Sequence, residues 1–331
     1  AALRMAVDSA LGRIDDRLRG VARLQIGALA VLAESGVPTR WIDPLADEER
    51  AGEDTGAGAA GEDADALNSA EDAHLALTAL TKASVVQQST DGGVTMLHRL
   101  QGQVLRESWN LEEWAEAFDA AAGLLGQVNI DSLPRKNTEG RRREARDLID
   151  QLRAIAAQDY SHRLFEREQV RVRLHHAFRH ANDLGLPYEA LTLREAVRVV
   201  ESILGADHPD TLVLRNNLAG AYQAAGRLGE AITLYAAVIA DRSRVLGPNH
   251  PQTLTSRNNL ALAHQRAGRL SQAISLYKEV VADRVRILGP NHPHTLSSRS
   301  NLAYTYQRAG RLSKAIFLYE EVLADCVRVL G

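Results

Sequence analysis

The chain has 331 residues, 45% of them hydrophobic and 24% charged, with a formal net charge of −3. This composition excludes a chain that is disordered throughout and is sufficient for two domains with real cores. The single Cys, Cys326, excludes intrachain disulfides and zinc sites built from Cys, and it favours a reducing, cytoplasmic setting. No run of 18 apolar residues occurs, which excludes a transmembrane helix.

Residues 1–106 are predicted to form a small N-terminal domain. Helical patterns cover residues 3–17 and 21–34, and a third short helix is expected after Val37-Pro38. Residues 51–66 are Gly, Ala, Glu and Asp almost throughout, so we expect a disordered acidic insertion there. Eleven acidic residues and one Arg lie between Asp43 and Asp72. This charge is either simply solvated or matched to a basic partner, and the sequence favours neither alternative.

A helix over residues 70–81 and a β-hairpin follow the acidic segment. Two short runs with β-branched residues, 84–88 and 94–97, are joined through Asp91-Gly92, a strong hairpin signal. Another helix is expected to start at His98. Helices followed by a hairpin are typical of a winged-helix domain.

The amino-acid sequence of this region resembles that of a known domain. Leu77-x-x-Leu80-x-x-x-Ser84, Asp91-Gly-Gly-Val94 and His98-Arg-Leu-Gln101 are similar to the winged helix that follows the nucleotide-binding domain in bacterial NB-ARC ATPases of the STAND class. The resemblance implies an ATP-binding domain upstream. No Gly-x-x-x-x-Gly-Lys-Ser/Thr motif occurs in the chain, which also starts without Met. We therefore expect the C-terminal portion of a longer protein.

Residues 107–205 are predicted to form divergent helical repeats. Amphipathic segments cover residues 108–128 and 139–157, and a degenerate repeat is expected to begin with a helix over 164–183. Gly185-Leu-Pro-Tyr-Glu-Ala-Leu aligns with Gly226-Arg-Leu-Gly-Glu-Ala-Ile, and both stretches run on to a Leu-Gly stop. Divergence is expected where a repeat array caps or joins another domain.

Residues 206–331 contain a 42-residue unit repeated three times, and the second and third copies are identical at 30 of 42 positions. Each copy opens with His-Pro, carries Asn-Leu-Ala in the middle, continues to Ala-Gly-Arg-Leu and closes on Leu-Gly. Apolar spacings of three and four predict two helices per copy, with Pro in the first turn of the first helix and Gly at its end. Such units bury their apolar faces only by stacking, which predicts an α-solenoid.

These residues resemble tetratricopeptide repeats of the kinesin-light-chain type. The resemblance is carried by Leu-Ala in the first helix, an aromatic residue or His after it, and then the Gly, Ala and Tyr of each copy. One signature position is usually large and apolar but is Arg here, in Arg215, Arg257 and Arg299. Each Arg either lays its stem along a helix seam or reaches the groove. The fold class expected overall is mainly α, a tetratricopeptide-repeat α-solenoid preceded by a small winged-helix domain with a β-hairpin.

The resemblance places polar first-helix side chains on the concave side of the solenoid. Asn amides offer a donor and an acceptor side by side, which suits clamping the backbone of an extended peptide. The competing interpretation is that these residues cap or bridge neighbouring helices. The expected binding residues are Asn216, Asn217, Gln223, Asn258, Asn259, Gln265, Arg266, Ser300, Asn301, Gln307 and Arg308.

The core of the array is expected at the helix seams, where Leu260, Ala273, Tyr277 and Leu302 are predicted to be buried.

No pattern for catalysis, a metal or a cofactor is present, and we expect a non-catalytic chain. Three functional classes remain: a protein- or peptide-binding sensor and relay of a STAND-type ATPase, a free-standing adaptor, and a transcription regulator that uses the winged helix. The helix after the hairpin, residues 98–107, has only two Arg, too few for strong phosphate binding, so a nucleic-acid partner is disfavoured. We favour the first class, with a ligand in the repeat groove and the upstream ATPase domain as partners.

Overall fold

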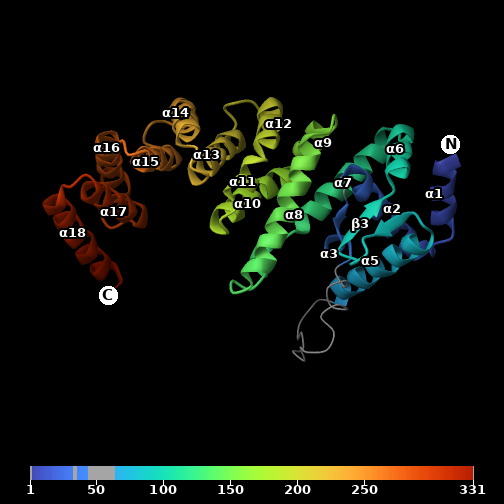
Figure 1. Cartoon of the computed structure of the whole chain (residues 1–331). Coiled ribbons are helices and arrows are strands. Elements are labelled where there is room, and N and C mark those ends of the chain that lie inside the picture. The colour runs from blue at the N-terminus through green and yellow to red at the C-terminus, as the bar shows by residue number, and fades with distance from the viewer. Residues whose placement is uncertain (1, 33–35, 44–63, 331) are drawn as a thin grey trace. The chain divides into compact units, whose positions relative to one another are not determined.

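The computed structural model describes residues 2–32, 36–43 and 64–330, with the side chains of 64–69 and 329–330 left out (Figure 1). The chain divides into two compact units, Ala1–Ala177 and Phe178–Gly331. This division differs from the three-part organisation expected from the sequence, 1–106, 107–205 and 206–331.

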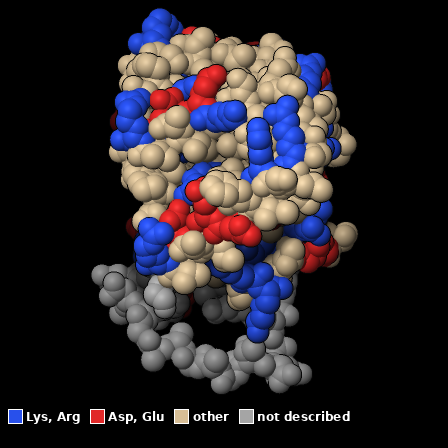
Figure 2. Space-filling view, turned by 90° about the vertical axis from the view of Figure 1, so that its left-hand side faces the viewer, with Lys and Arg blue, Asp and Glu red and all other residues tan. Residues whose placement is uncertain are grey.

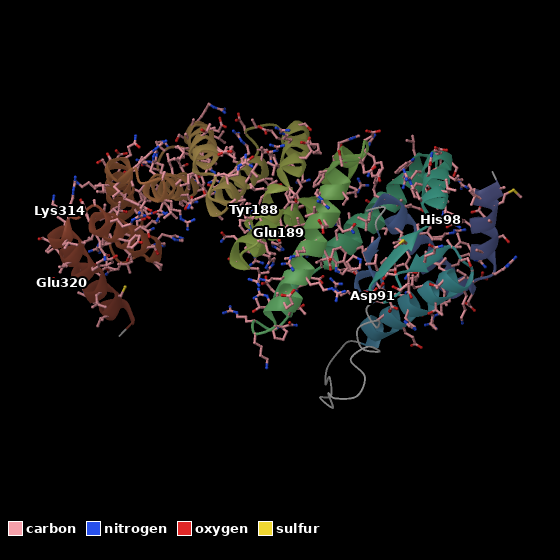
Figure 3. The ribbon with its side chains drawn as sticks, viewed as in Figure 1. Asp91, His98, Tyr188, Glu189, Lys314 and Glu320 are labelled. Atoms are coloured by element: carbon pink, nitrogen blue, oxygen red, sulfur yellow. The ribbon has the colours of Figure 1, made fainter. Side chains whose placement is uncertain are left out.

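The first unit contains a three-stranded antiparallel sheet with the strand order β1-β3-β2. β2 (Val86–Gln88) pairs with β3 (Val94–Leu97), which confirms the predicted hairpin, and β1 (Val37–Pro38) pairs with the other edge of β3. The carboxylate of Asp91, labelled in Figure 3, accepts hydrogen bonds from the Gly93 N–H and the Ser89 hydroxyl and so holds the turn. Gly92 has a φ of 65°, the conformation for which Gly is preferred.

The helices of this unit follow the predicted order with shifted ends. The predicted short third helix is α3, and α5 begins at Ala64, inside the segment 51–66 that was predicted to be disordered; residues 51–63 of that segment lie outside the described residues. His98 caps α6, because its Nδ1 accepts a hydrogen bond from the Leu100 N–H. The bounds are α1 Ala2–Gly12, α2 Asp16–Val31, α3 Thr39–Ile42, α5 Ala64–Lys82, α6 Arg99–Ser108, α7 Leu111–Gln127, η1 Ile130–Ser132, α8 Thr138–Ala156, α9 Ser161–Phe165 and α10 Glu168–Asp183.

Helix α7 packs along α2, although the sequence assigned its residues to a divergent repeat. The two helices approach closely because Gly27 has no side chain: a Cβ built there would lie 3.2 Å from the Cα of Ala117. The buried face of α7 is rich in Ala, which keeps this contact short. The expected boundary between residues 106 and 107 falls inside α6, so no break in the fold marks it.

The predicted helix over residues 164–183 is wrong at its start. The chain forms α9, turns at Glu166 and Arg167, and only then forms α10. The Arg171 guanidinium donates to the carbonyl oxygens of Phe165 and Glu166 and satisfies acceptors at this turn. Both helices carry apolar residues at helical spacing, so the apolar periodicity by itself does not reveal the turn between them.

The second unit is built of helix pairs (Figure 1). His208, His250 and His292 each accept a hydrogen bond at Nδ1 from the backbone N–H two residues on, which confirms that each His-Pro starts a helix. Gly226, Gly268 and Gly310 have φ values between 73° and 77° and end the first helices. The bounds are α11 Pro187–Leu191, α12 Arg194–Leu204, α13 Pro209–Ala224, α14 Leu228–Val245, α15 Pro251–Arg266, α16 Leu270–Leu288, α17 Pro293–Arg308 and α18 Leu312–Leu330.

The core between these helices contains three of the four predicted seam residues. Ala273 and Tyr277 are fully buried, and Leu302 is buried in the same cluster. Leu260 is only half-buried, so the prediction was wrong for that residue. Its counterparts Leu218 and Leu302 are followed one turn later by a buried Tyr, whereas Leu260 is followed by the smaller His264, which covers less of the same helix face.

Of the two expected placements for the unusual Arg, the one at a helix seam fits the structure, since Arg215 and Arg257 are half-buried and Arg299 is buried. Each forms an ion pair with an Asp of the second helix in its own copy. The contacts join Arg215 to Asp241 at 2.8 Å, Arg257 to Asp283 at 2.8 Å, and Arg299 to Asp325. Each guanidinium thus ties the two helices of its repeat together, and only the Asp partner was not foreseen from the sequence.

This ion pair predicts a loss of stability in acid. Burial raises the pKa of Asp283, but hydrogen bonds from Arg286 and Arg257 outweigh it and hold the pKa below its usual range. A carboxyl whose pKa is depressed by folding stabilises the fold above its unfolded pKa of about 4, and this contribution disappears as the pH falls through the folded pKa. Asp283→Asn should therefore lower the urea midpoint at pH 7, and the difference from the wild type should shrink in acid. A difference that stays constant with pH contradicts this account.

Candidate functional site

Each first helix of the three repeats presents one face that no other helix covers fully. Positions spaced by four, three and four residues share a helix face, and at these positions every side chain is half-buried or exposed in all three copies. We call this face the open stripe. It consists of Val213, Asn217, Gly220 and Ala224 in α13, Thr255, Asn259, Leu262 and Arg266 in α15, and Ser297, Asn301, Tyr304 and Arg308 in α17.

The amides of Asn217, Asn259 and Asn301 form the constant part of the open stripe. Each side chain is half-buried, and within the described residues none of the three forms a hydrogen bond. Asn216 and Asn258 each accept a hydrogen bond of 2.9 Å from a Ser of the next first helix, so adjacent first helices lie side by side. The repeat therefore aligns three free amides along one surface.

Asn216 and Asn258 have a structural role, as the competing interpretation proposed. Their partners Ser256 and Ser298 also accept a hydrogen bond from a buried Arg of a second helix, Arg242 and Arg284. Each Asn thus completes a chain of polar contacts inside the array. Ser300, at the same position in the third copy, is half-buried.

Two other predicted binding residues are removed from the candidate site. Gln223 and Gln265 are buried, and the Gln265 amide donates to the Thr305 hydroxyl at 2.6 Å. They lie one residue away from the open stripe, a difference that a count of helical positions did not resolve. Gln307, at the equivalent position of α17, is exposed.

Among the variable members of the open stripe, Arg266 and Arg308 were expected from the sequence and the others were not. Reading three and four residues in each direction from Asn217 would have found them. One set runs from Gly220 through Leu262 to Tyr304, so side-chain size grows along the array. Both charged residues of the stripe are Arg, Arg266 and Arg308, and both are exposed. The surface therefore carries a row of polar amides, is basic at one end, and has side chains of increasing size along the array.

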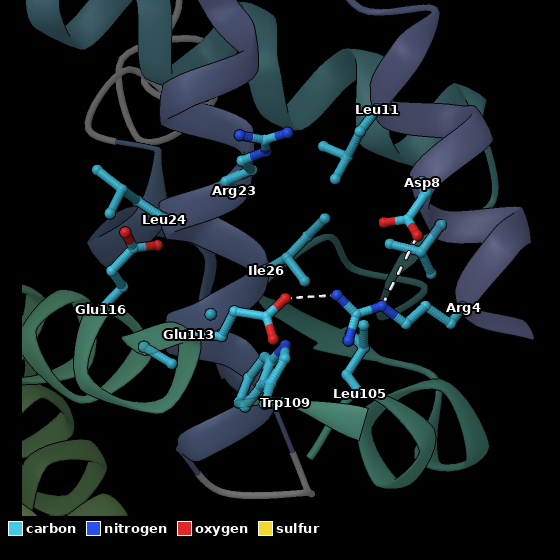
Figure 4. A pocket seen from close by; sticks show the side chains of 13 residues that line it. Arg4, Asp8, Leu11, Arg23, Leu24, Ile26, Leu105, Trp109, Glu113 and Glu116 are labelled. Carbon is cyan, nitrogen blue, oxygen red and sulfur yellow. Dashed lines mark hydrogen bonds and ion pairs between the residues drawn. The ribbon is translucent and has the colours of Figure 1, made fainter. Parts of the chain in front are cut away.

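The first unit has a small cavity of about 270 Å³ between α1, α2, α6 and α7 (Figure 4). Arg4 donates to Glu113 and to Ser108, and lies 3.7 Å from Asp8. Burial raises the pKa of Glu113, but the Asn110 N–H and the Arg4 guanidinium outweigh it, and the pKa is lowered. Arg4, Asp8 and Glu113 already interact with one another, which argues against a ligand site built on these three groups.

In the described part of the chain, no three His, Cys, Asp or Glu side chains are grouped so that they could hold a metal ion. No described helix combines the length and the apolar character that crossing a membrane requires.

A match to a protein-family model supports the repeat assignment. The tetratricopeptide repeat family model matches residues 179–240, 210–284 and 281–326. A putative kinesin light chain of P. anserina with nearly identical repeats is 28% identical, over 59% of this chain and 92% of that one, with a TM-score of 0.49. BtubC from P. vanneervenii is 13% identical, over 69% of this chain and 86% of that one, with a TM-score of 0.46. No curated protein matches the sequence significantly.

Tetratricopeptide repeats suggest a protein-binding scaffold or adaptor. The family match begins at residue 179, close to the start of the second unit at Phe178, and ends within α18. Residues 179–326 are a tetratricopeptide-repeat array.

Proposed function

We propose that the open stripe binds an extended peptide segment of a partner protein, and that the chain acts without catalysis as a sensor or adaptor. The observation that carries this proposal is the row of amides at Asn217, Asn259 and Asn301. They are accessible in part, repeat at the same position and have no partner among the described residues. A polar group that the fold does not use is available to a ligand.

An amide row suits a peptide backbone. Each Asn side chain can donate to a carbonyl and accept from an N–H of an extended segment, whatever the ligand's side chains are. The variable neighbours would then select the sequence. The exposed Arg266 and Arg308 favour acidic ligand residues, and Leu262 and Tyr304 offer apolar contact.

Peptide display tests this proposal. A random peptide library is selected on the purified chain, and the recovered peptides are titrated by fluorescence anisotropy against the wild type and a variant with Asn217, Asn259 and Asn301 all changed to Ala. Because a hydrogen bond contributes about 0.5–1.5 kcal/mol net, the triple variant should bind at least about tenfold more weakly.

The matched control changes three exposed polar residues of the second helices, Gln272, Ser275 and Ser313, to Ala. Its affinity should equal that of the wild type. If no peptide is recovered, or if the triple Asn variant binds as well as the control, the open stripe is not a peptide site.

We propose for the first unit a relay role of the kind the STAND resemblance implies. Helices α2, α3 and α5, with the hairpin β2–β3 and a third strand at its edge, support a winged-helix arrangement. In such a protein the ligand must bind the active and inactive states with different affinity, since equal affinity shifts no equilibrium. The relay itself should not bind ATP, which calorimetry on the purified chain checks. Micromolar affinity for ATP contradicts the assignment.

A free-standing adaptor would use the same open stripe and differs only in lacking the relay. A transcription regulator finds less support, because α5, the helix before the hairpin, carries Glu71 and Asp72 and has Lys82 only in its last turn. Acidic residues on that helix repel DNA phosphates.

A further inference from the structure

A pocket of about 620 Å³ lies in the first unit between α7 and α9, and aromatic rings form much of its wall. Trp114 and Phe118 are one turn apart on α7, so their side chains share a helix face. Tyr160, directly before α9, adds a third ring. We call the space that these three residues line the aromatic pocket. Leu111, Ala115, Asp159, His162, Arg163 and Arg167 line the rest of it.

The three rings contact one another and form one continuous apolar wall. The ring centroids of Trp114 and Phe118 are 5.1 Å apart, and the two rings are stacked. The centroid of Tyr160 lies 5.5 Å from that of Trp114 and 5.8 Å from that of Phe118. The Tyr160 hydroxyl donates to the carbonyl oxygen of Val31 at 3.0 Å, which holds this ring in place. A pocket of this volume with an apolar wall and a few polar groups is typical of a site for a small ligand.

Two opposite charges at the pocket, Asp159 and Arg163, are not paired with each other. Both side chains are exposed, and neither has a hydrogen-bond or ion-pair partner among the described residues. Opposite charges one turn apart commonly pair, as Asp150 and Arg153 do at 3.0 Å in α8. Figure 2 shows acidic and basic side chains next to one another at the end of the molecule that carries α18. The aromatic pocket therefore offers one unpaired carboxylate and one unpaired guanidinium beside an apolar wall.

The other guanidinium at the pocket, that of Arg167, is already engaged. It donates to the Asp119 carboxylate at 2.8 Å and to the Arg163 carbonyl oxygen, and it lies 5.3 Å from the centroid of the Phe118 ring. These contacts fix Arg167 against the aromatic wall. Arg163 is thus the guanidinium that remains for a ligand.

We propose that the aromatic pocket binds a free aromatic amino acid. The ligand ring packs on the wall of Trp114, Phe118 and Tyr160, where aromatic contacts add to the burial of apolar surface. Its carboxylate accepts from the Arg163 guanidinium, and its ammonium group donates to the Asp159 carboxylate. A ligand with only one of these charges would leave the other protein group unpaired. The site lies in the first unit and uses no residue of the open stripe, so it is independent of the proposed peptide binding.

Saturation-transfer NMR titrations of the purified chain test this proposal with four probes. L-phenylalanine carries the ring and both charges, and its Kd should be about 1 mM or lower. Phenylpropionate lacks the ammonium group and phenylethylamine lacks the carboxylate. Each should bind about fivefold more weakly, the effect of losing one ion pair at an exposed rim. N-acetyl-L-phenylalaninamide stands for a Phe residue inside a peptide and should bind more weakly than either.

Two variants assign the charges to their partners. Arg163→Gln should weaken L-phenylalanine about fivefold and leave phenylethylamine unchanged, because only the carboxylate loses its partner. Asp159→Asn should weaken L-phenylalanine by a similar factor without weakening phenylpropionate. The matched controls are Asp150→Asn and Arg153→Gln, which remove the same charges from an exposed pair outside the pocket and should bind as the wild type does.

Circular dichroism should give the same helix content for all variants, since all four substituted side chains are exposed. The proposal is overturned if the wild type gives no saturation-transfer signal with L-phenylalanine. It is equally overturned if the capped amide binds as tightly as the free amino acid, because the site would then accept a peptide residue. Arg163→Gln and Asp159→Asn variants that bind L-phenylalanine as the controls do also contradict it.

Discussion

Changing Tyr277 to Ala should lower the free energy of unfolding by about 3–5 kcal/mol, the usual cost of emptying an aromatic site in a core. Tyr277 is fully buried in the cluster that joins α15, α16, α17 and α18. Ala261 and Ala273 in the same cluster are too small to fill the space that the ring would leave. Urea unfolding followed by circular dichroism measures the loss.

Tyr277→Phe is the control that separates packing from hydrogen bonding. The Tyr277 hydroxyl is buried and has no hydrogen-bond partner among the described residues, and burial raises its pKa well above the usual range. Removing a buried hydroxyl that has no partner should leave stability unchanged or increase it. If Phe costs as much as Ala, the ring is not what stabilises this seam.

The same variant tests how far the array transmits a local defect. Repeats couple mainly to their neighbours, so Tyr277→Ala should reduce hydrogen-exchange protection in α15 to α18 first. Protection in α7 and α8 of the first unit should change little. A uniform loss of protection over the whole chain contradicts nearest-neighbour coupling.

Changing Arg284 to Ala should lower the free energy of unfolding of the array by about 2–3 kcal/mol. Arg284 is 4% exposed and donates to the His294 carbonyl at 2.7 Å and to the Ser298 hydroxyl at 2.6 Å. Burial of the guanidinium lowers its pKa. Without it, the fully buried Ser298 loses a donor and the long Arg stem no longer fills the seam.

Arg286→Ala, two residues along the same helix, is the matched control. Its side chain is 59% exposed and pairs with Asp283 at the surface, where an ion pair contributes at most about 1 kcal/mol. In thermal and urea unfolding, Arg284→Ala should therefore be clearly less stable than Arg286→Ala. Equal losses from the two substitutions would show that Arg284 does not tie the helices together.

Several features of the second unit could be predicted from the sequence because they are local and repeated. His250 and Pro251 start a helix through backbone geometry and a nearby N–H, and Gly268 ends it through its own φ. The hairpin between Val86 and Leu97 depends in the same way on a short turn. Such signals involve residues only a few positions apart, so a linear reading detects them.

The candidate site could be predicted only in part. Asn217, Asn259 and Asn301 were expected on the binding face and are the free amides of the open stripe, whereas Gln223 and Gln265 were expected there and are buried. On a helix, adjacent positions lie about 100° apart, so one step along the sequence decides between a free face and a helix seam. That decision depends on where the neighbouring repeat packs.

The sequence by itself determined the repeat period, the helix pairs with their caps, and the presence of a hairpin, because each follows from contacts within one repeat or one turn. The tertiary structure alone decided that α7 packs on α2, that Arg257 pairs with Asp283, that Arg284 ties adjacent repeats, and that Leu260 is only half-buried. These outcomes depend on which side chains from distant segments compete for the same space and the same hydrogen-bond acceptors. Side-chain packing decides which of these side chains are buried and paired, and the periodicity of the sequence does not show the outcome.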